Sequence, residues 1–222
     1  MIQRLQGIGM TSLRTRERMI KRLVDQGITH NKVLEVMRDT PRHIFVDEAL
    51  ASRAYEDVAL PIGYNQTISQ PYIVARMTEL LLKSTHHHLK KVLEIGTGCG
   101  YQTAVLAQLV DHVYSMERIL PLQRKAKNYL WDLRLKNISF MYADGGAGWA
   151  DYAPFDGILV SAAPADIPSA FLQQLAIGGV LVLPVGMAGR QSLQRITRIS
   201  EDNYDIEQFD AVTFVPFLSG KE

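Results

Sequence analysis

Cysteine is almost absent from this 222-residue sequence, in which Cys99 is the single thiol. One thiol excludes an internal disulfide framework and a zinc site built from cysteines. A dominant charge of either sign is also missing, since 24 Lys and Arg residues oppose 23 Asp and Glu residues for a net charge of +1. A nearly neutral chain has no global field that would draw it to nucleic acid or to anionic lipid.

Long apolar runs are missing as well. Stretches such as Gly178–Val185 are too short to cross a bilayer, and Met1–Met10 has no apolar core of the kind found in signal peptides. We therefore expect a soluble, cytoplasmic protein in a reducing setting, with no membrane partner. The 47% of hydrophobic residues are enough for a sizeable core. The length predicts one domain over residues 1–222 with a small extension.

The first seventy residues differ in texture from the rest and predict a helical extension over 1–70. Apolar residues near helical spacing predict a helix that ends at Gly27, and a second helix is expected over Thr29–Arg38. Basic side chains line the opposite face of the first helix: Arg14, Arg16, Arg18, Lys21 and Arg22. They fit either a nucleic-acid surface or a solvated helix face, and the near-neutral chain favours the second interpretation.

Residues 71–222 are predicted to form the cofactor-binding α/β core. Short apolar strands alternate there with amphipathic helices, and the expected strands are Val92–Ile95, Val113–Met116, Ile138–Tyr142, Phe155–Ser161 and Val180–Val185. This alternation predicts a doubly wound, mostly parallel sheet with helices on both faces, as in Rossmann-like folds. Leu193–Ile199 and Ala211–Phe217 are expected to be strands at the sheet edge.

A glycine-rich turn follows the first of these strands. Gly96, Gly98 and Gly100 alternate with other residues and lead into a helix. Glycines let the backbone turn tightly and let a ligand approach closely, and ligands of open α/β sheets bind beyond the carboxyl ends of the strands. The spacing is not the dinucleotide pattern G-x-G-x-x-G. Glu94, just before the turn, suggests either an acid near a cationic ligand or a hydrogen-bonded turn.

Two acids follow the next two strands. Glu117 is placed to accept both hydroxyls of an adenosine ribose. Asp144 can accept from an adenine amino group, and Gly145 leaves room for the ring. Each alone also fits a surface acid or an Asp-Gly turn. Together with the glycine turn they describe one pocket, which suits an adenosine bearing a sulfonium better than a pyrophosphate, since a P-loop lysine is absent.

A polar segment precedes the helix that begins near Pro71. Ser69 is a natural N-cap with Pro71 in the first turn, and capping alone would explain it. A helix N-terminus with hydroxyl groups is also an anion site, so Thr67, Ser69 and nearby free amides are candidates for holding a substrate carboxylate.

Several motifs of other enzyme classes are absent. His86, His87 and His88 are consecutive and cannot all face one metal ion, so we expect no metal site. The sequence has no H-E-x-x-H, no C-x-x-C and no nucleophile elbow. Ser161-Ala162-Ala163-Pro164 follows the fourth strand, where amino-directed nucleic-acid methyltransferases carry a polar residue and an aromatic.

Taken together, these motifs resemble the protein-L-isoaspartate (D-aspartate) O-methyltransferase family, whose members use S-adenosylmethionine. The resemblance covers nearly the whole chain and is most specific in Pro41–Val46, Ala59–Pro71 and Leu93–Tyr101. Further matches are Pro154–Pro164, Gly178–Gly186 and Phe214–Pro216. Two departures are Ala143, where the family often has Gly, and Phe217, where Leu is common.

The resemblance implies methyl transfer from S-adenosylmethionine to the free α-carboxyl of L-isoaspartyl residues, and of D-aspartyl residues, in damaged proteins. The ester then closes to a succinimide. By position, Ser69 is the family's active-site serine, and the implied neighbours are Thr67 and the Ile68 backbone at the junction with the cofactor, Gly96 and Gly98 under its methionyl part, and the Val215 backbone beside the substrate main chain. We expect a monomer whose partners are isoaspartyl peptides and proteins, without nucleic acid.

Three other functions remain open from the residues alone. A nucleic-acid methyltransferase would share the cofactor turn but needs a basic cleft, which only the Arg14–Arg22 stripe offers. An NAD-dependent oxidoreductase is disfavoured by the glycine spacing. A non-catalytic module would bind the adenosyl cofactor without transferring its methyl group.

Overall fold

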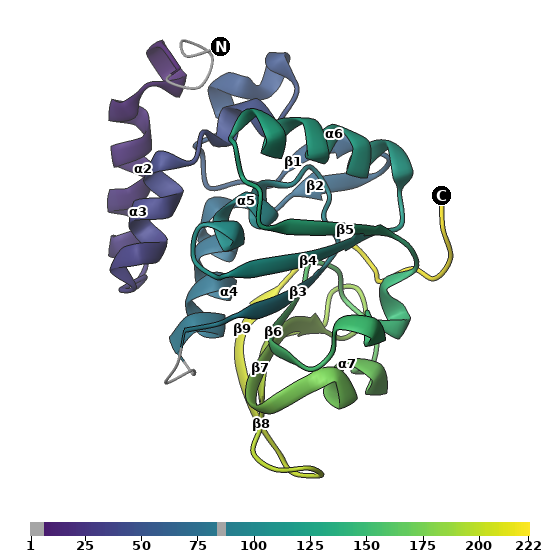
Figure 1. Cartoon of the computed structure of the whole chain (residues 1–222). Helices are drawn as coiled ribbons and strands as arrows, with labels where there is room; N and C mark the ends of the chain where they lie inside the picture. Colours follow the sequence, from purple (N-terminus) through teal and green to yellow (C-terminus); the bar gives the residue numbers. More distant parts are fainter. Residues whose placement is uncertain (1–6, 84–87) are drawn as a thin grey trace.

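The computed structural model describes residues 7–83 and 88–222. Its centre is a seven-stranded sheet in the order β5-β4-β3-β6-β7-β8-β9 (Figure 1). The five parallel strands are β3 (Lys91–Ile95), β4 (His112–Glu117), β5 (Ile138–Tyr142), β6 (Phe155–Val160) and β7 (Leu175–Val185). The two antiparallel strands are β8 (Gln191–Arg198) and β9 (Tyr204–Val212). The predicted doubly wound, mostly parallel sheet is therefore confirmed.

Both faces of the sheet are covered, because its central strands are apolar on both sides. Along β3, Val92 packs into one hydrophobic cluster, whereas Leu93 and Ile95 pack into the other. The helices that contribute to the first cluster include α4 (Pro71–Lys83), α5 (Tyr101–Ala107) and α6 (Leu120–Asp132). The second cluster includes Phe171 of α7 (Ser169–Gln174). Such cover on two faces is what a parallel sheet requires.

The strand order reverses next to β3. The chain runs outward from β3 through β4 to β5, and then crosses back to place β6 on the other side of β3. Ligands of open α/β sheets bind at this reversal, beyond the carboxyl ends of the strands. The topology alone therefore points to the turns that follow β3 and β6.

The N-terminal extension is built from helices and one hairpin. Helices α2 (Leu13–Asp25) and α3 (Asn31–Asp39) pack together beside α4 (Figure 1). A short 3-10 turn, η1 (Gly9–Thr11), precedes α2. Two more, η2 (Arg42–Phe45) and η3 (Glu48–Arg53), connect α3 to the hairpin. The hairpin of β1 (Leu60–Gly63) and β2 (Gln66–Ile68) runs directly into α4. The sequence-based division at residue 70 falls in the link between β2 and α4.

The basic stripe of α2 is only partly a solvated face. Arg14, Arg18 and Lys21 are exposed, as expected for that interpretation. Arg16 is instead buried and donates to the Asp39 carbonyl at 3.3 Å, and Arg22 donates to the Tyr55 carbonyl at 2.6 Å. Two of the five basic side chains are therefore used to tie α2 to the rest of the extension.

The last strand of the sheet lies at another position than the sequence predicts. The expectation of a strand over Ala211–Phe217 is wrong, because β9 spans Tyr204–Val212. This edge strand is largely exposed and carries many polar side chains, so it lacks the apolar pattern of an inner strand. The residues after Val212 leave the sheet and bond instead to Ala163, whose N–H donates to the Val215 carbonyl at 2.9 Å.

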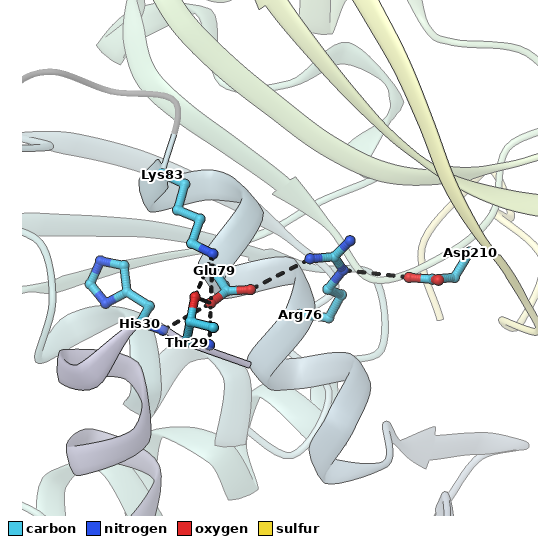
Figure 2. Close-up of polar contacts among 6 residues, drawn as sticks. All are labelled: Thr29, His30, Arg76, Glu79, Lys83 and Asp210. Carbon is cyan, nitrogen blue, oxygen red and sulfur yellow. Dashed lines mark hydrogen bonds and ion pairs between the residues drawn. The ribbon is translucent and has the colours of Figure 1, made fainter. Parts of the chain in front are cut away.

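A buried carboxylate connects the N-terminal helices to the core (Figure 2). The side chain of Glu79 on α4 is fully buried, and its Oε1 accepts from the backbone N–H groups of Thr29 at 2.8 Å and His30 at 2.9 Å. Lys83 and Arg76 form ion pairs with it at 3.1 Å and 3.5 Å. Since α3 begins at the next residue, Asn31, Glu79 satisfies free N–H groups just before that helix.

Replacing Glu79 by Gln should lower the free energy of unfolding by about 1–3 kcal/mol at neutral pH, because charge-assisted hydrogen bonds are lost. Burial raises the pKa of Glu79, but hydrogen bonds from Thr29, Lys83 and His30 outweigh it and hold the pKa below its usual value. A carboxyl with a lowered folded-state pKa adds stability above its unfolded pKa of about 4.3, and this stability disappears as the pH falls through the folded-state value.

Urea unfolding of both proteins across pH 2.5–7 checks this prediction. The gap between the wild type and Glu79→Gln should close at acidic pH. Glu56→Gln is the matched control, because Glu56 forms only an exposed ion pair with Arg53. A gap of constant size over the whole pH range would show that the charge of Glu79 is not the cause.

Candidate active site

A pocket with about 720 Å³ of empty space opens at the carboxyl ends of the central strands. It is bounded by the turns that follow four parallel strands, by the β1–β2 hairpin and by the C-terminal segment. Its lining residues are Ile62, Gln66, Thr67, Ser69, Ile95, Gly96, Gly98, Met116, Glu117, Arg118, Ile119, Ala143, Gly145, Ser161, Ala162, Val215, Pro216, Phe217 and Leu218. The pocket therefore lies where the reversal of strand order predicts a ligand site.

The glycine turn bends over the end of β4. Gly96 and Thr97 both donate their backbone N–H to the Met116 carbonyl, at 2.9 Å and 3.1 Å. Gly96 has φ +93° and Gly98 has φ +54°, values that favour glycine. As the sequence predicts, both glycines line the pocket. A ligand can therefore approach bare backbone at this point.

Glu117 is fixed at the pocket wall by three backbone donors. Its Oε2 accepts from Gly98 N–H at 2.7 Å, and its Oε1 accepts from the N–H groups of Arg118 at 2.8 Å and Ile119 at 2.9 Å. Burial raises the pKa of Glu117, and these hydrogen bonds partly offset the effect. Because a carboxylate oxygen has two lone pairs, Oε2 keeps one acceptor site for a hydroxyl group in the pocket.

Asp144 lies beside the pocket rather than in its lining. Its Oδ1 accepts from Gly146 N–H at 2.9 Å and its Oδ2 from Gly220 N–H at 2.6 Å, and these bonds lower its pKa. The C-terminal segment passes the ends of β4 and β5 here (Figure 1). The flanking residues Ala143 and Gly145 do line the pocket.

Glu94 is turned away from the pocket, against our expectation of a cofactor contact. Its side chain is completely buried, and Oε2 accepts from Ser115 Oγ at 2.5 Å and Thr103 Oγ1 at 2.6 Å. Burial raises its pKa to about 7, although the two hydroxyl groups lower it in part. The contacts match the other interpretation of Glu94, a hydrogen-bonded group that braces the turn from below.

Ser69 does not cap the helix, so the capping interpretation is wrong. Helix α4 begins at Pro71, two residues later, and Gln70 supplies the first carbonyl that accepts a helical bond, from Val74 N–H at 3.2 Å. The free N–H of Tyr72 is taken by Asp57 Oδ1 at 2.9 Å, from the loop before the hairpin. The Ser69 hydroxyl is therefore not needed at the helix start.

Ser69 instead lies where three cavities meet. Thr67, Ser69 and Ser161 line the main pocket, a cavity behind the glycine turn and a groove beside the C-terminal segment. The groove is completed by Ala59, Gln70, Ile73, Thr213, Phe214 and Val215. Ile68 lines the cavity behind the turn. Three residues with hydroxyl side chains are thus shared by the main pocket and the groove.

The groove wall at Phe214 is held by a side chain that the sequence did not single out. Gln191, at the start of β8, is 6% exposed, and its Oε1 accepts from Phe214 N–H at 2.6 Å while its Nε2 donates to the Phe214 carbonyl at 3.2 Å. In the sequence, Ser161 stood out only because its segment lacks the polar residue and the aromatic of amino-directed nucleic-acid methyltransferases. The position of Ser161 at a strand end was its one signal, whereas a glutamine at the start of a strand gives none.

The described residues hold no group of three or more His, Cys, Asp and Glu side chains that could bind a metal ion. His88 Nε2 is 2.7 Å from Asp111 Oδ1, whereas His86 and His87 lie outside the described residues. Burial raises the pKa of Cys99 to about 11, so its thiol stays protonated near neutral pH. Among the described helices, none has the length and apolarity for a membrane span.

The parallel sheet, its glycine turn and the acid at the end of the next strand define a Rossmann-like methyltransferase fold. A family model described as protein-L-isoaspartate(D-aspartate) O-methyltransferase matches residues 14–222. The chain belongs to this family, whose enzymes use S-adenosylmethionine.

Relatives named protein-L-isoaspartate O-methyltransferase agree with this family. The one from Cellvibrio japonicus (strain Ueda107) is 61% identical over 221 residues, covering 97% of this chain and 96% of that protein. One from Pseudomonas aeruginosa (strain UCBPP-PA14) is 58% identical over 211 residues, covering 95% and 99%.

Solved structures support the fold. A Plasmodium falciparum protein described as a putative member, in complex with S-adenosyl-L-homocysteine, aligns with a TM-score of 0.78 at 21% identity, over 92% of this chain and 99% of that one. A second protein-L-isoaspartate O-methyltransferase aligns with a TM-score of 0.76 at 26% identity, over 90% and 65%.

Replacing Glu117 by Gln should weaken binding of S-adenosylhomocysteine by about 10-fold or more, because a carboxamide cannot accept from all three backbone donors and a ribose. Isothermal titration calorimetry measures the change. Asp111→Asn is the control, since Asp111 is exposed and contacts His88. An unchanged affinity in Glu117→Gln would remove this residue from the cofactor site.

Proposed function

We propose that this protein transfers a methyl group from S-adenosylmethionine to the free α-carboxyl of L-isoaspartyl residues, and of D-aspartyl residues, in damaged proteins. The ester closes to a succinimide, which hydrolyses in part to normal aspartate. One observation carries the proposal beyond family membership. Thr67, Ser69 and Ser161 line both the glycine-walled pocket and the groove, so a peptide carboxylate and a bound cofactor can meet there.

The pocket residues suit the adenosyl cofactor. Gly96 and Gly98 offer bare backbone to its methionyl part, and Glu117 Oε2 offers an acceptor to a ribose hydroxyl. We assign the adenine to the wall at Gly145, with its amino group directed to Asp144, whose Oδ2 would then accept from this amino group as well as from Gly220 N–H. Thr67 and the backbone of Ile68 are assigned to the junction between cofactor and substrate.

The groove suits an extended peptide. Gln191 and Ala163 hold the backbone at Phe214 and Val215 from the protein side. We propose that the backbone around Val215 pairs with the main chain of the substrate. Because the Val215 carbonyl already accepts from Ala163 N–H, we assign the N–H of Val215 to this pairing.

The chemistry needs positioning more than proton transfer. The acceptor is a carboxylate with an unperturbed pKa of about 3.5–4, so it is ionised at neutral pH and requires no general base. The bound cofactor supplies an activated methyl group on a sulfonium. In-line alignment of two bound reactants can lower a barrier by roughly 7–11 kcal/mol. The residues that line the pocket include no histidine, so Ser69 is assigned to orienting the carboxylate and not to covalent attack.

Three finer points belong to the same proposal. We propose that the protein works as a monomer, that it works in the cytoplasm, and that nucleic acid is not its substrate. The balanced charge and the inward use of Arg16 and Arg22, which breaks up the basic stripe, support the exclusion of nucleic acid. Light scattering of the purified protein tests the monomeric state.

Transfer of labelled methyl groups to a pair of peptides tests the proposed function. The peptides share one sequence and differ only in an aspartyl or an isoaspartyl linkage. We expect label in the isoaspartyl peptide alone, released by mild base because it is an ester. Label in RNA or DNA, with none in the isoaspartyl peptide, would establish the nucleic-acid alternative instead.

Replacing Ser69 by Ala should lower kcat on the isoaspartyl peptide by about 10- to 100-fold, since an orienting hydrogen bond at the reacting group is lost. Affinity for S-adenosylhomocysteine should stay near that of the wild type. Ser139→Ala is the matched control, because Ser139 bonds to His112 in the sheet, away from the pocket. If the Ser69 variant loses cofactor affinity as strongly as turnover, the assignment to the acceptor carboxylate is wrong.

A further inference from the structure

The segment Pro41–Val46 is the one specific motif to which the proposed function gives no role. Its Arg42 has no exposed surface, although the side chain is a guanidinium. Nε donates to the Ala54 carbonyl at 2.7 Å, and Nη2 donates to the Ser69 carbonyl at 2.7 Å. The guanidinium carbon lies 4.8 Å from the centre of the Tyr101 ring. Arg42 thus joins the N-terminal extension, the Ser69 segment and the helix after the glycine turn.

Burying the Arg42 guanidinium costs more free energy than burying an apolar side chain that only fills space. Among residues 7–83 and 88–222, Nη1 of Arg42 has no hydrogen-bond partner, and no carboxylate there forms an ion pair with the guanidinium. Burial lowers the pKa of Arg42, but an arginine side chain stays protonated in proteins. A buried, unpaired cation is among the most expensive groups to keep inside a protein. The cost of keeping Arg42 buried therefore points to a function for its two hydrogen bonds.

The bond to Ser69 supplies one. Ser69 sits between two short elements, after β2 and before α4, and Asp57 rather than Ser69 satisfies Tyr72 at the helix start. Arg42 supplies a charge-assisted hydrogen bond to the backbone of Ser69 from the side of the interior. Its ring contact, Tyr101, lines the cavity behind the glycine turn together with Ser69. The guanidinium is therefore placed to fix the distance between the serine and the cofactor turn.

We propose that Arg42 is a positioning residue for methyl transfer, because its guanidinium holds the Ser69 backbone against the first residue of the helix that follows the glycine turn. The inference rests on the proposed function and adds a residue to it. Arg42 touches neither reactant. Its effect passes through Ser69, whose hydroxyl orients the acceptor carboxylate toward the methyl group. A misplaced reacting group costs turnover even when both reactants still bind.

The chain contains a matched control for this role. Arg16 is also buried, donates to a backbone carbonyl at Asp39 and lies 5.8 Å from the ring centre of Tyr55. These contacts stay within the N-terminal extension and do not reach Ser69. Arg16→Met thus removes a comparable buried guanidinium without disturbing the serine.

The test compares Arg42→Met, Arg42→Lys and Arg16→Met in the full-length protein. Methyl transfer to the isoaspartyl peptide gives kcat and KM, and calorimetry with S-adenosylhomocysteine gives cofactor affinity. Arg42→Met should lower kcat by about 10- to 100-fold with cofactor affinity within about twofold of the wild type. Arg42→Lys keeps one charged donor and should recover part of that loss, whereas Arg16→Met should keep the wild-type kcat.

A double variant separates positioning from general damage. If Arg42 acts through the serine, Arg42→Met should lower kcat by no more than about twofold further in a Ser69→Ala background. The same 10- to 100-fold loss in both backgrounds overturns the proposal, as does an Arg42→Met protein with wild-type kcat. Should Arg42→Met fail to fold, Arg42→Lys and its double variant with Ser69→Ala decide by the same comparison. A wild-type protein that leaves the isoaspartyl peptide unmethylated overturns the proposed function as well, whereas an active wild type confines a failure to Arg42.

Discussion

The pocket depends on one connection, between the glycine turn after β3 and the end of β4. Three backbone N–H groups of the turn reach across: Gly96 and Thr97 bond to the Met116 carbonyl, and Gly98 bonds to the Glu117 carboxylate. The turn is therefore shaped by its neighbour strand and not by glycine freedom alone. The buried Glu94 braces the same place from beneath, through Ser115 and Thr103. A cofactor that lies on this turn meets a surface whose polar groups are already oriented, which reduces the cost of ordering them on binding.

The serine side of the site is built in a different way. Its segment is a short link between a hairpin and a helix, with little regular structure of its own. Its position comes from long-range contacts: Asp57 fixes the helix start at Tyr72, and Arg42 reaches the Ser69 carbonyl from the N-terminal extension. Glu79 ties that extension to the same helix. The extension thus supports the candidate active site through these contacts, although only its hairpin and Ser69 in the link after it line the pocket.

The sequence predicted those features that are local or periodic. Alternating apolar strands and helices gave the parallel core, because burial on both faces leaves a continuous apolar pattern. Gly96, Gly98 and Glu117 could be placed because strand ends in such sheets converge on one edge. What could not be read were contacts between distant segments. Asp57, and not Ser69, serves Tyr72 at the helix start, and Asp144 bonds to Gly220 from the far end of the chain. Residues 204–212 form an edge strand whose many exposed polar residues leave no regular alternation of apolar and polar residues in the sequence.

The C-terminal segment links the two halves of the site. Val215 lines the groove as well as the pocket, and Phe217 and Leu218 line the pocket. The N–H of Gly220 donates a hydrogen bond to Asp144 Oδ2. One stretch of backbone therefore forms a wall of the proposed acceptor site and a wall of the proposed donor site. Gln191 holds its beginning, and Arg118 holds its end through the Gly220 carbonyl at 2.9 Å. Because methyl transfer demands alignment of a bound anion with a bound cation, a shared wall fixed at both ends makes the position of one reactant depend on that of the other.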